Sequence, residues 1–416
     1  MADTRLEAIR SKVLNGTRLD LEDGLALYRT RDLFTLGELA NSVRERLHGR
    51  RAYYNINRHI NYTNFCVLRC KFCSFYRTHE GPRGPGVEGP SGLPGALPLA
   101  QPAGGPNAAD LRLARDGGYE YSVAQVVELA AEACARGATE VHIVGGLHPK
   151  LPFSYYTDLC RGIKARCPEL HIKAFTAIEI VHFTRVARPR MSIAEVLTAL
   201  RAAGLDSLPG GGAEIFDDRV HAEAFRNKVG EQHWFDVHRV AHELGIPSNA
   251  TMLYGHVESV EERLGHMLKL RAHQDVSLRE RKAAFQCFVP LSFIPEGSAF
   301  AHLPGPSGLD DLRTLAVARL MLDNFPHIKA FWVMHSPKLA QVALNWGVDD
   351  FDGTVVWYDI TRREGRGTNR QELTVAEIHR LAREAGCVPT ERDTLYRPVQ
   401  RSAPAAASPD RDPTQT

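Results

Sequence analysis

The sequence predicts an α/β fold in which eight strand–helix units close into a parallel (β/α)8 barrel of the TIM type. The first observation is that strand-like and helix-like hydrophobic patterns alternate from residue 51 onward. The second is their number: eight units in strict alternation favour a closed barrel over an open doubly wound sheet. The third is the length of 416 residues, which accommodates one large barrel with additions.

The chain divides into three predicted parts. Residues 1–50 are predicted to be an N-terminal helical segment, because Leu and Ala recur three and four positions apart between residues 19 and 48. Residues 51–398 are predicted to form the barrel. Residues 399–416 have the composition of a disordered tail.

Within the barrel, β-prone stretches and stretches of helical period take turns along the chain. The predicted strands lie in "AYYNINRHINYTNFC", "EVHIVGG", "HIKAFTAIEI", "DSLPGGGAEIF", "SNATMLYGH", "AFQCFVPLSF", "HIKAFWVM" and "DGTVVWYDI". The predicted helices that follow them lie in "SVAQVVELAAEACARGA", "YYTDLCRGIKARC", "SIAEVLTALRAAGL", "WFDVHRVAHELG", "SVEERLGHMLKLRAHQ", "LDDLRTLAVARLMLDN", "PKLAQVALNWG" and "TVAEIHRLAREAG".

One segment interrupts this alternation. Residues 80–109 contain eight Gly and seven Pro, half of the stretch, which exceeds the roughly 25–30% typical of low-complexity disorder. Such a composition cannot bury enough apolar surface to offset the entropy of ordering. We expect a disordered insertion that decorates the barrel.

Composition excludes several classes of protein. A net charge of only +2 gives no electrostatic footprint for nucleic acid or for a membrane surface. No apolar run approaches the roughly 20 residues that span a bilayer, and the charged N-terminus is unlike a signal peptide. Eight cysteines in 416 residues are too sparse for a disulfide scaffold, so a reduced, cytoplasmic protein is expected.

The stretch "CVLRCKFC" places Cys66, Cys70 and Cys73 within eight residues. Structural zinc prefers four ligands, and no second CxxC pair follows; His59 or His79 would have to supply the fourth. A redox pair would use Cys70 and Cys73 and leave Cys66 idle. A cubic iron–sulfur cluster is the third interpretation, in which three thiolates leave one iron open to a ligand that is not protein.

The spacing CxxxCxxC, with an aromatic residue before the last cysteine, resembles the motif of the radical S-adenosylmethionine enzymes. The resemblance implies a 4Fe–4S cluster on Cys66, Cys70 and Cys73, whose open iron chelates S-adenosylmethionine. It also implies reductive cleavage to methionine and a 5′-deoxyadenosyl radical. The remaining cysteines are scattered singly and are interpreted as small buried hydrophobic residues.

Two glycine-rich stretches follow predicted strands. Gly145 and Gly146 in "IVGGLHP" resemble the family turn that receives the methionine amino group, although such a pair is also common in simple turns. The second stretch is "LPGGGAEI", which lacks the Lys-Ser/Thr of a phosphate loop. Its cofactor-binding candidates, set against a tight turn with a helix-capping glutamate, are Gly210, Gly211, Gly212 and Glu214.

A narrower resemblance rests on "INRHINYTNFC", "GLDSLPGGGAEIF", "AHELGIPSNATMLYGHVES", "FVPLSFIPE" and "DDFDGTVV". Together they resemble the radical enzymes of the futalosine route to menaquinone, and "SNATMLYGH" and "VPLSF" lean toward the aminofutalosine synthase family. The alternatives are the cyclic dehypoxanthinyl futalosine synthases and the deazaflavin synthase subunits. The insertion at 80–109 departs from the family pattern.

This resemblance implies addition of the adenosyl radical to 3-[(1-carboxyvinyl)oxy]benzoate, which yields 6-amino-6-deoxyfutalosine, methionine and bicarbonate. S-adenosylmethionine is then a consumed co-substrate. The implied partners are this small molecule and an electron donor such as flavodoxin or ferredoxin, with no nucleic acid and no membrane.

Side chains at the C-terminal ends of barrel strands are the catalytic candidates, because barrel enzymes build their sites there. Lys173 and Lys329 fall at strand beginnings and are left outside the site. The polar candidates near strand ends are His59, Asn61, Asn64, Glu179, Asn249, Thr251, Tyr254, His256 and His335.

Overall fold

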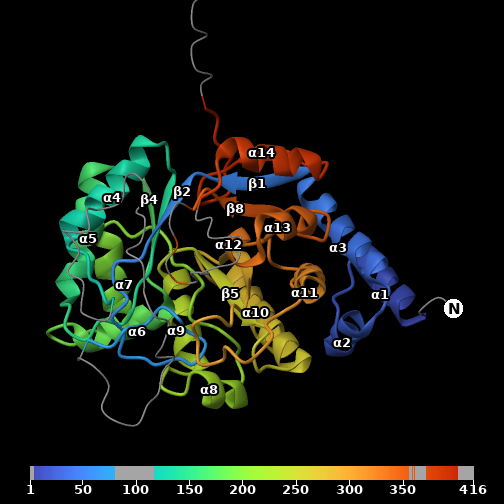
Figure 1. The fold of residues 1–416 in the computed structure, drawn as a ribbon, viewed down its shortest axis with the longest axis horizontal. Helices are drawn as coiled ribbons and strands as arrows, with labels where there is room; N and C mark the ends of the chain where they lie inside the picture. The colour runs from blue at the N-terminus through green and yellow to red at the C-terminus, as the bar shows by residue number, and fades with distance from the viewer. Residues whose placement is uncertain (1–3, 80–116, 356–357, 359, 361–371, 402–416) are drawn as a thin grey trace, which may run out of the picture.

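The computed structural model describes residues 4–79, 117–355, 358, 360 and 372–401 (Figure 1). The predicted insertion at 80–109 and residues 402–416 of the predicted tail lie outside the described residues.

The described strands are short and lie in the interior of the molecule, with the helices around them (Figure 1). They are β1 (Arg51–Asn55), β2 (Asn57–Ile60), β3 (Glu140–Ile143), β4 (His171–Ala174), β5 (Ser248–Tyr254), β6 (Phe285–Ser292), β7 (His327–Ile328), β8 (Asp350–Gly353) and β9 (Val388–Glu391).

All of the described ladders are parallel, and together they form a closed ring. The three sheets have the orders β8-β1-β9, β2-β3-β4 and β5-β6-β7, and β1 runs on into β2 through Ile56. Single bridges join the sheets: Lys173 pairs with Ser207, Leu208 with Ser248, and Lys329 with Asp350. The sequence therefore folds into the predicted parallel barrel.

Helices form the outer layer of the barrel. Most of them begin at a residue whose side chain caps the first turn. Ser122, Ser192, Ser259 and Thr374 each accept a hydrogen bond from the N–H three residues on, in capping boxes. The barrel helices are α4 (Val123–Ala135), α5 (Phe153–Arg166), α6 (Ala177–Val186), α7 (Ile193–Ala202), α8 (Asp218–Ala224), α9 (Glu231–Glu243), α10 (Val260–Glu280), α11 (Gly308–Met321), α12 (Trp332–His335), α13 (Pro337–Ala343) and α14 (Val375–Glu384).

Three helices precede the barrel and lie against one side of it (Figure 1). They are α1 (Thr4–Leu14), α2 (Leu21–Arg29) and α3 (Leu33–His48). The predicted helical stretch over 19–48 is two helices, because Asp20 caps α2 and Asp32 caps α3. α2 packs against α10 and α11, and α3 packs against α11.

Four elements differ from their predicted form. The predicted strand "HIKAFWVM" is a strand only at its start, because "WVM" belongs to α12. The β-prone run "TAIEI" is the start of α6, in which Thr176 and Glu179 form a capping box. The fourth predicted strand is reduced to the bridges of Ser207 and Leu208. β9 was not predicted. It pairs with β1 on the edge opposite to β8.

The segment after β9 closes the N-terminal end of the barrel, which we call the barrel floor. Arg392, only 1% exposed, donates to Asp350 Oδ2 at 2.8 Å, and the Tyr396 hydroxyl donates to the same oxygen at 2.5 Å. Thr394 Oγ1 donates to Glu140 Oε2 at 2.7 Å. Arg392 thus neutralises the buried Asp350, and the two hydroxyls add hydrogen bonds to Asp350 and Glu140.

Of the described helices, none is both long and apolar enough to span a lipid bilayer.

Candidate active site

The loop that follows β2, residues 61–79, carries the three clustered cysteines. Cys66, Cys70 and Cys73 are all partly buried and free of disulfide bonds. Backbone hydrogen bonds fix the loop, since Cys66 N donates to Arg77 O at 3.0 Å and Val67 N donates to Leu147 O at 3.0 Å. The three thiols are therefore presented together by a loop that is tied to the barrel.

The surroundings of these thiols fit ligation of a metal cluster. Burial raises the pKa of all three, that of Cys70 to about 12, and neighbouring thiols raise the pKa of Cys70 and Cys73 further. The Leu68 N–H donates to Cys66 Sγ at 3.4 Å. All three thiols are carried by one loop, and thiols that resist ionisation on their own become good ligands once a metal supplies positive charge.

The glycine turn after β3 packs directly under the cysteine loop. A Cβ on Gly145 would lie 2.7 Å from the Tyr62 ring, and a Cβ on Gly146 would overlap the Phe65 carbonyl oxygen. Gly146 N donates to Thr63 O at 2.8 Å. Both glycines are required for this close approach, whatever else they bind.

Glu179, at the start of α6, lies beneath this turn. Its Oε1 accepts hydrogen bonds from the Tyr62 hydroxyl at 2.7 Å and from Gly145 N at 3.1 Å. Its Oε2 accepts from Thr176 N at 2.7 Å. Burial raises the pKa of the carboxyl to about 7, and these hydrogen bonds oppose the shift.

Gly210, Gly211 and Gly212 follow the fourth predicted strand and belong to a second part of the candidate site. A Cβ on Gly210 would lie 2.6 Å from the Ala250 backbone, and Thr251 Oγ1 donates to Gly210 O at 2.8 Å. Gly212 has φ 92° and Glu214 has φ 47°, so the chain turns tightly here.

Glu214 forms a buried ion pair with Lys228, a residue that sequence reasoning missed. Lys228 Nζ also lies 5.6 Å from the centroid of the Phe72 ring, inside the cysteine motif, and 5.5 Å from that of Phe225. Its charge opposes the rise in the pKa of Cys70. Lys228 comes from the connection between α8 and α9, where no periodic pattern identifies it.

The barrel interior below the cysteine loop holds a stack of rings. His59 stacks on His142 with centroids 4.4 Å apart, and on Phe331 at 5.8 Å. Tyr358 meets the His59 ring edge-on at 5.2 Å and interacts electrostatically with Cys73. We call the rings of His59, His142, Phe331 and Tyr358 the ring stack.

His59 is an unusual buried histidine. It is 5% exposed, and neither ring nitrogen has a hydrogen-bond partner among the described residues. Burial lowers its pKa to about 4, so the ring is neutral at pH 7 with one donor and one acceptor free. Buried unpaired nitrogens are costly, which is typical of a group that awaits a ligand. His142, its register partner on β3, was missed; the alternation in "EVHI" was the available signal.

Deeper in the barrel, lysines are paired with acids. Lys173 Nζ donates to Glu140 Oε2 at 2.8 Å, and Lys329 Nζ donates to Asp352 Oδ1 at 2.5 Å. Both lysines are buried and both face acids of neighbouring strands. They therefore build the polar interior below the ring stack.

Other predicted residues have local structural partners. Asn61 Nδ2 donates to Val144 O at 3.0 Å, and Asn64 bonds to Gly117 O and Tyr119 N, so both tie the cysteine loop to its neighbours. Asn249 is buried on β5, and its N–H donates to Leu208 O at 3.2 Å.

Three predicted residues lie where β5 and α12 meet the outer helices. The Tyr254 hydroxyl donates to Asp311 on α11 at 2.6 Å and contacts His335 Nε2 at 3.0 Å. The guanidinium of Arg263 on α10 lies 5.2 Å from the Tyr254 ring centroid. His256 Nε2 bonds to Leu253 O at 3.1 Å. The structure does not bring Tyr254 and His335 into the ring stack.

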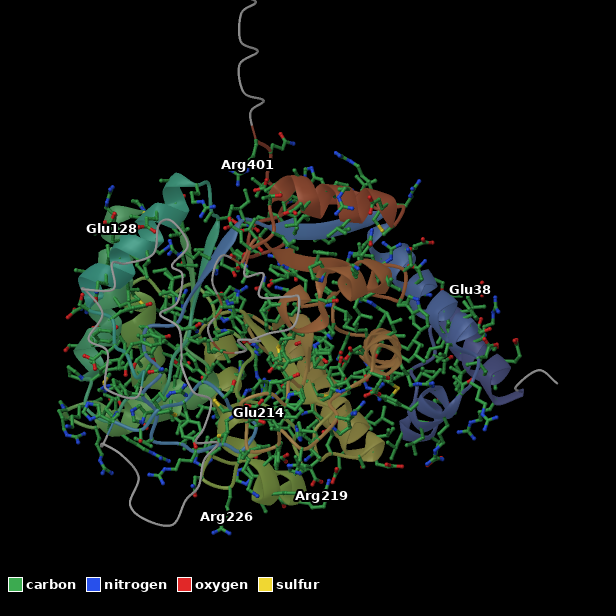
Figure 2. The ribbon with its side chains drawn as sticks, viewed as in Figure 1. Glu38, Glu128, Glu214, Arg219, Arg226 and Arg401 are labelled. Carbon is green, nitrogen blue, oxygen red and sulfur yellow. The ribbon has the colours of Figure 1, made fainter. Side chains whose placement is uncertain are left out.

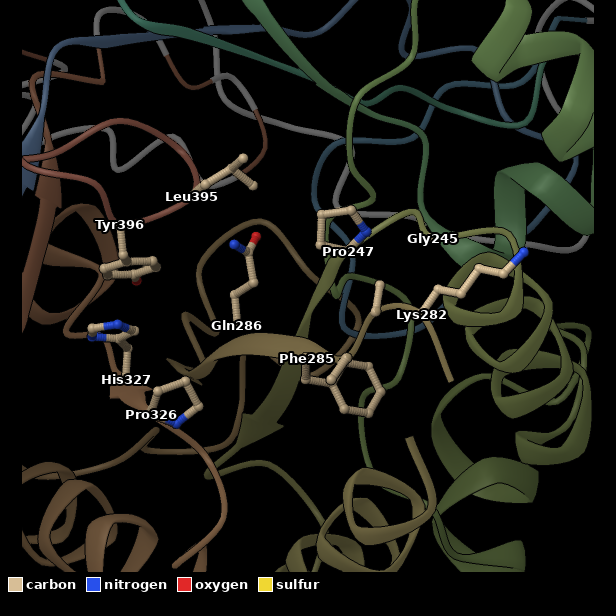
Figure 3. Close-up of a pocket in the computed structure, with 11 residues that line it drawn as sticks. Gly245, Pro247, Lys282, Phe285, Gln286, Pro326, His327, Leu395 and Tyr396 are labelled. Atoms are coloured by element: carbon tan, nitrogen blue, oxygen red, sulfur yellow. The ribbon is translucent and has the colours of Figure 1, made fainter. Parts of the chain in front are cut away.

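A cavity of about 440 Å³ lies at the opposite end of the barrel, beside the floor (Figure 3). Tyr396 and His327 line one side of it with their rings stacked 3.5 Å apart, and Lys282 stands on another. His327 belongs to a buried group with His48 and Asp349. Both histidines of this group already have hydrogen-bond partners in the protein, since His327 bonds to Asp349 at 2.6 Å and His48 bonds to Pro326 O at 2.8 Å.

Comparison with known proteins agrees with this geometry. Residues 60–270 match the radical SAM superfamily, and residues 282–405 match the CofH/MqnC C-terminal region. The chain is 46% identical to the aminodeoxyfutalosine synthase of Thermus thermophilus, over 96% of this chain and 97% of that protein. It is 39% identical to the aminodeoxyfutalosine synthase of Streptomyces coelicolor, over 93% and 92%.

More distant relatives define the wider group. The cyclic dehypoxanthine futalosine synthase of Halalkalibacterium halodurans is 31% identical over 94% of both chains. The crystal structure of methylornithine synthase superposes with a TM-score of 0.63 at 16% identity, over 92% of this chain and 97% of that one, which shows the shared fold.

The barrel and its three-thiol loop define a class, and the chain belongs to the radical S-adenosylmethionine superfamily, in the group with a CofH/MqnC C-terminal region. Within that group its similarity is greater to the aminodeoxyfutalosine synthases above than to the cyclic dehypoxanthine futalosine synthase.

Proposed function

We propose that this chain is an aminofutalosine synthase of menaquinone biosynthesis. It joins the 5′-deoxyadenosyl group of S-adenosylmethionine to 3-[(1-carboxyvinyl)oxy]benzoate and yields 6-amino-6-deoxyfutalosine, methionine and bicarbonate. The observation that carries the proposal is the three-thiol loop over a polar barrel interior, in a chain 46% identical to such a synthase over nearly its full length. Because the thiols are free, we place the enzyme in the reducing cytoplasm.

Cys66, Cys70 and Cys73 would hold a 4Fe–4S cluster as thiolates. When bound, the cluster supplies the electron that cleaves S-adenosylmethionine. Gly145 and Gly146 would present their backbone carbonyls to the methionine end of this co-substrate. Gly210, Gly211 and Gly212 would contact the nucleoside through their backbone.

Glu214 and Lys228 form a buried charged pair beside Phe72 of the cysteine loop. Glu214 would accept from the ribose hydroxyls while Lys228 balances its charge. Holding both ends of the adenosine keeps the radical carbon from reaching other hydrogen donors.

The ring stack would line one side of the substrate site. His59 has one free donor and one free acceptor, so it would orient a substrate carboxylate or the ether oxygen without carrying charge. Asn249 and Thr251 would line the wall from β5. The flat rings suit the aromatic substrate, because stacked aromatic pairs are worth about 0.5–1.5 kcal/mol beyond area burial.

The test separates addition from hydrogen abstraction. The reconstituted enzyme receives S-adenosylmethionine labelled with deuterium on its 5′ carbon, a reductant and 3-[(1-carboxyvinyl)oxy]benzoate. Mass spectrometry should find both deuteriums in the nucleoside product, without 5′-deoxyadenosine formed in step with turnover. Stoichiometric 5′-deoxyadenosine would instead assign the chain to a hydrogen-abstracting relative, such as a cyclic dehypoxanthinyl futalosine synthase or a deazaflavin synthase subunit.

A further inference from the structure

A surface cavity of about 230 Å³ opens beside Cys70. Its walls come from two segments: Arg69, Cys70 and Lys71 of the cysteine loop, and residues 222–227 at the end of α8 and beyond. Of the three motif cysteines, Cys70 is the one among the lining residues. The cluster loop thus reaches the surface at this point.

The rim of this cavity carries uncompensated positive charge. Arg69, Lys71 and Arg226 are exposed, and none of them forms an ion pair with an acid of the described chain. Glu223 is the acid among the lining residues, and it is paired with Arg219 at 3.1 Å. We call Arg69, Lys71 and Arg226 the basic rim.

The two halves of the rim are held in register by backbone contacts. Lys71 N donates to Ala224 O at 2.9 Å, and Ala299 N donates to Lys71 O at 2.8 Å. Phe72 meets Phe225 edge-on at 6.0 Å beneath the surface. Figure 2 shows Arg226 projecting outward at the edge of the molecule, with Glu214 further inside. The two backbone segments that carry the positive charges are therefore held together beside the Cys70 cavity.

We propose that the basic rim is the docking face for an acidic one-electron carrier protein. The proposal rests on the proposed function, because a cluster that cleaves S-adenosylmethionine must first be reduced. One electron passes from the carrier to the cluster, and no bond is made or broken. Electron transfer slows steeply with distance, so the carrier must approach where a cluster thiolate is nearest the surface.

The chemistry of the rim favours a protein carrier over other polyanions. The chain as a whole has a net charge of only +2, so the positive field is local and matches one small face. Complementary charge of this kind raises the rate of encounter more than the affinity, which suits a carrier that must dock and leave quickly.

The experiment measures reduction of the reconstituted holoenzyme by flavodoxin hydroquinone in a stopped-flow instrument, followed by the visible absorbance of the cluster. For the native chain the second-order rate should fall as salt is added. Arg226→Glu should lower the low-salt rate by about tenfold, and Arg69→Glu with Arg226→Glu by more. Arg383→Glu is the matched control on α14, an exposed arginine of another face, and should leave the rate within about twofold.

Two readouts keep the outcome decisive. Iron content and the rate of reduction by dithionite, which needs no docking face, should be unchanged in Arg226→Glu, because Arg226 lies outside the cysteine motif. Equal flavodoxin rates in the native and double-variant enzymes would overturn the proposal. Cluster reduction is measured without substrate, so it stands or fails independently of the addition chemistry.

Discussion

Glu179 and Tyr62 are joined by a buried 2.7 Å hydrogen bond that links α6 to the segment entering the cysteine loop. The same carboxylate oxygen also holds the Gly145 N–H at 3.1 Å. One side chain therefore fixes the positions of the cysteine loop and the glycine turn relative to each other. This arrangement makes Glu179 a positioning residue with a measurable electrostatic consequence.

Glu179→Gln is expected to remove a pH dependence of stability. The folded pKa of about 7 lies above the ordinary value of 4.5, so the native state holds this proton more tightly than the unfolded chain does. Its contribution is complete below about pH 4.5 and is lost as pH rises through about 7, amounting to a few kcal/mol at most. Urea unfolding at pH 5 and pH 8 measures the difference.

Glu195→Gln is the control, because Glu195 occupies the same capping-box position in α7 but is exposed. Hydrogen bonds from Ser192 lower its pKa, so any effect should have the opposite sign. A native enzyme whose stability varies with pH in the same way as Glu179→Gln would contradict the raised pKa.

Gly146→Ala is expected to damage the cluster loop. The added Cβ would overlap the Phe65 carbonyl oxygen and lie 3.1 Å from Cys66 Cβ, so the loop must shift. We expect a loss of more than about 2 kcal/mol in stability together with reduced iron content after reconstitution. Gly265→Ala in α10 is the control: its Cβ meets nothing within 4 Å, and it should be stabilising by about 0.5–1 kcal/mol. Full iron loading in Gly146→Ala would show that the loop accommodates the methyl group.

Cys70→Ala is expected to abolish the visible absorbance of the cluster and all cleavage of S-adenosylmethionine, and Cys66→Ala and Cys73→Ala should do the same. Each removes one of three thiols that interact electrostatically on one loop. Cys134→Ala, an exposed cysteine of α4, should retain both properties. Iron and sulfide analysis with ultraviolet–visible spectra gives the measurement, and a full cluster in Cys70→Ala would exclude the ligand assignment.

His59→Phe is expected to separate cleavage of S-adenosylmethionine from product formation. Phenylalanine keeps the stacking with His142 and Phe331 but lacks both unpaired nitrogens. Nucleoside product should fall by about tenfold or more, while reductant-dependent methionine release continues. His273→Phe, a histidine packed against Phe235 and Phe285 outside the barrel, should change product formation by less than about twofold. Unaltered turnover in His59→Phe would remove His59 from the substrate site.

Periodicity was sufficient to predict the barrel, because alternation of strand and helix is a property of whole segments. It was insufficient at "TAIEI", where β-branched residues suggested a strand although Thr176 and Glu179 already had capping-box spacing. It also missed β9, whose short sequence "VPTE" has no alternation of its own and becomes a strand by pairing with β1.

The candidate site likewise has a part that the sequence could predict and a part that it could not. The cysteine loop could be predicted because its chemistry is local in sequence. Lys228 could not, since its role depends on Glu214 and Phe72, which reach it only through the fold. Likewise, Tyr254 stands at a strand end but turns outward to Asp311 on α11, and no sequence rule distinguishes the two faces of a short buried strand.

The pairing of β1 with β8 and β9 has a consequence for how the protein is made. β1 emerges early during synthesis, whereas both of its partners lie near the other end of the chain. Until translation is nearly complete, β1 therefore presents an unpaired strand edge, a feature that promotes aggregation. Ring closure must be a late and non-local event, which predicts slow folding. The nascent chain should consequently depend on chaperones more than a helical protein of equal length, and truncation before residue 350, which removes β8 as well as β9, should leave it with an unclosed barrel.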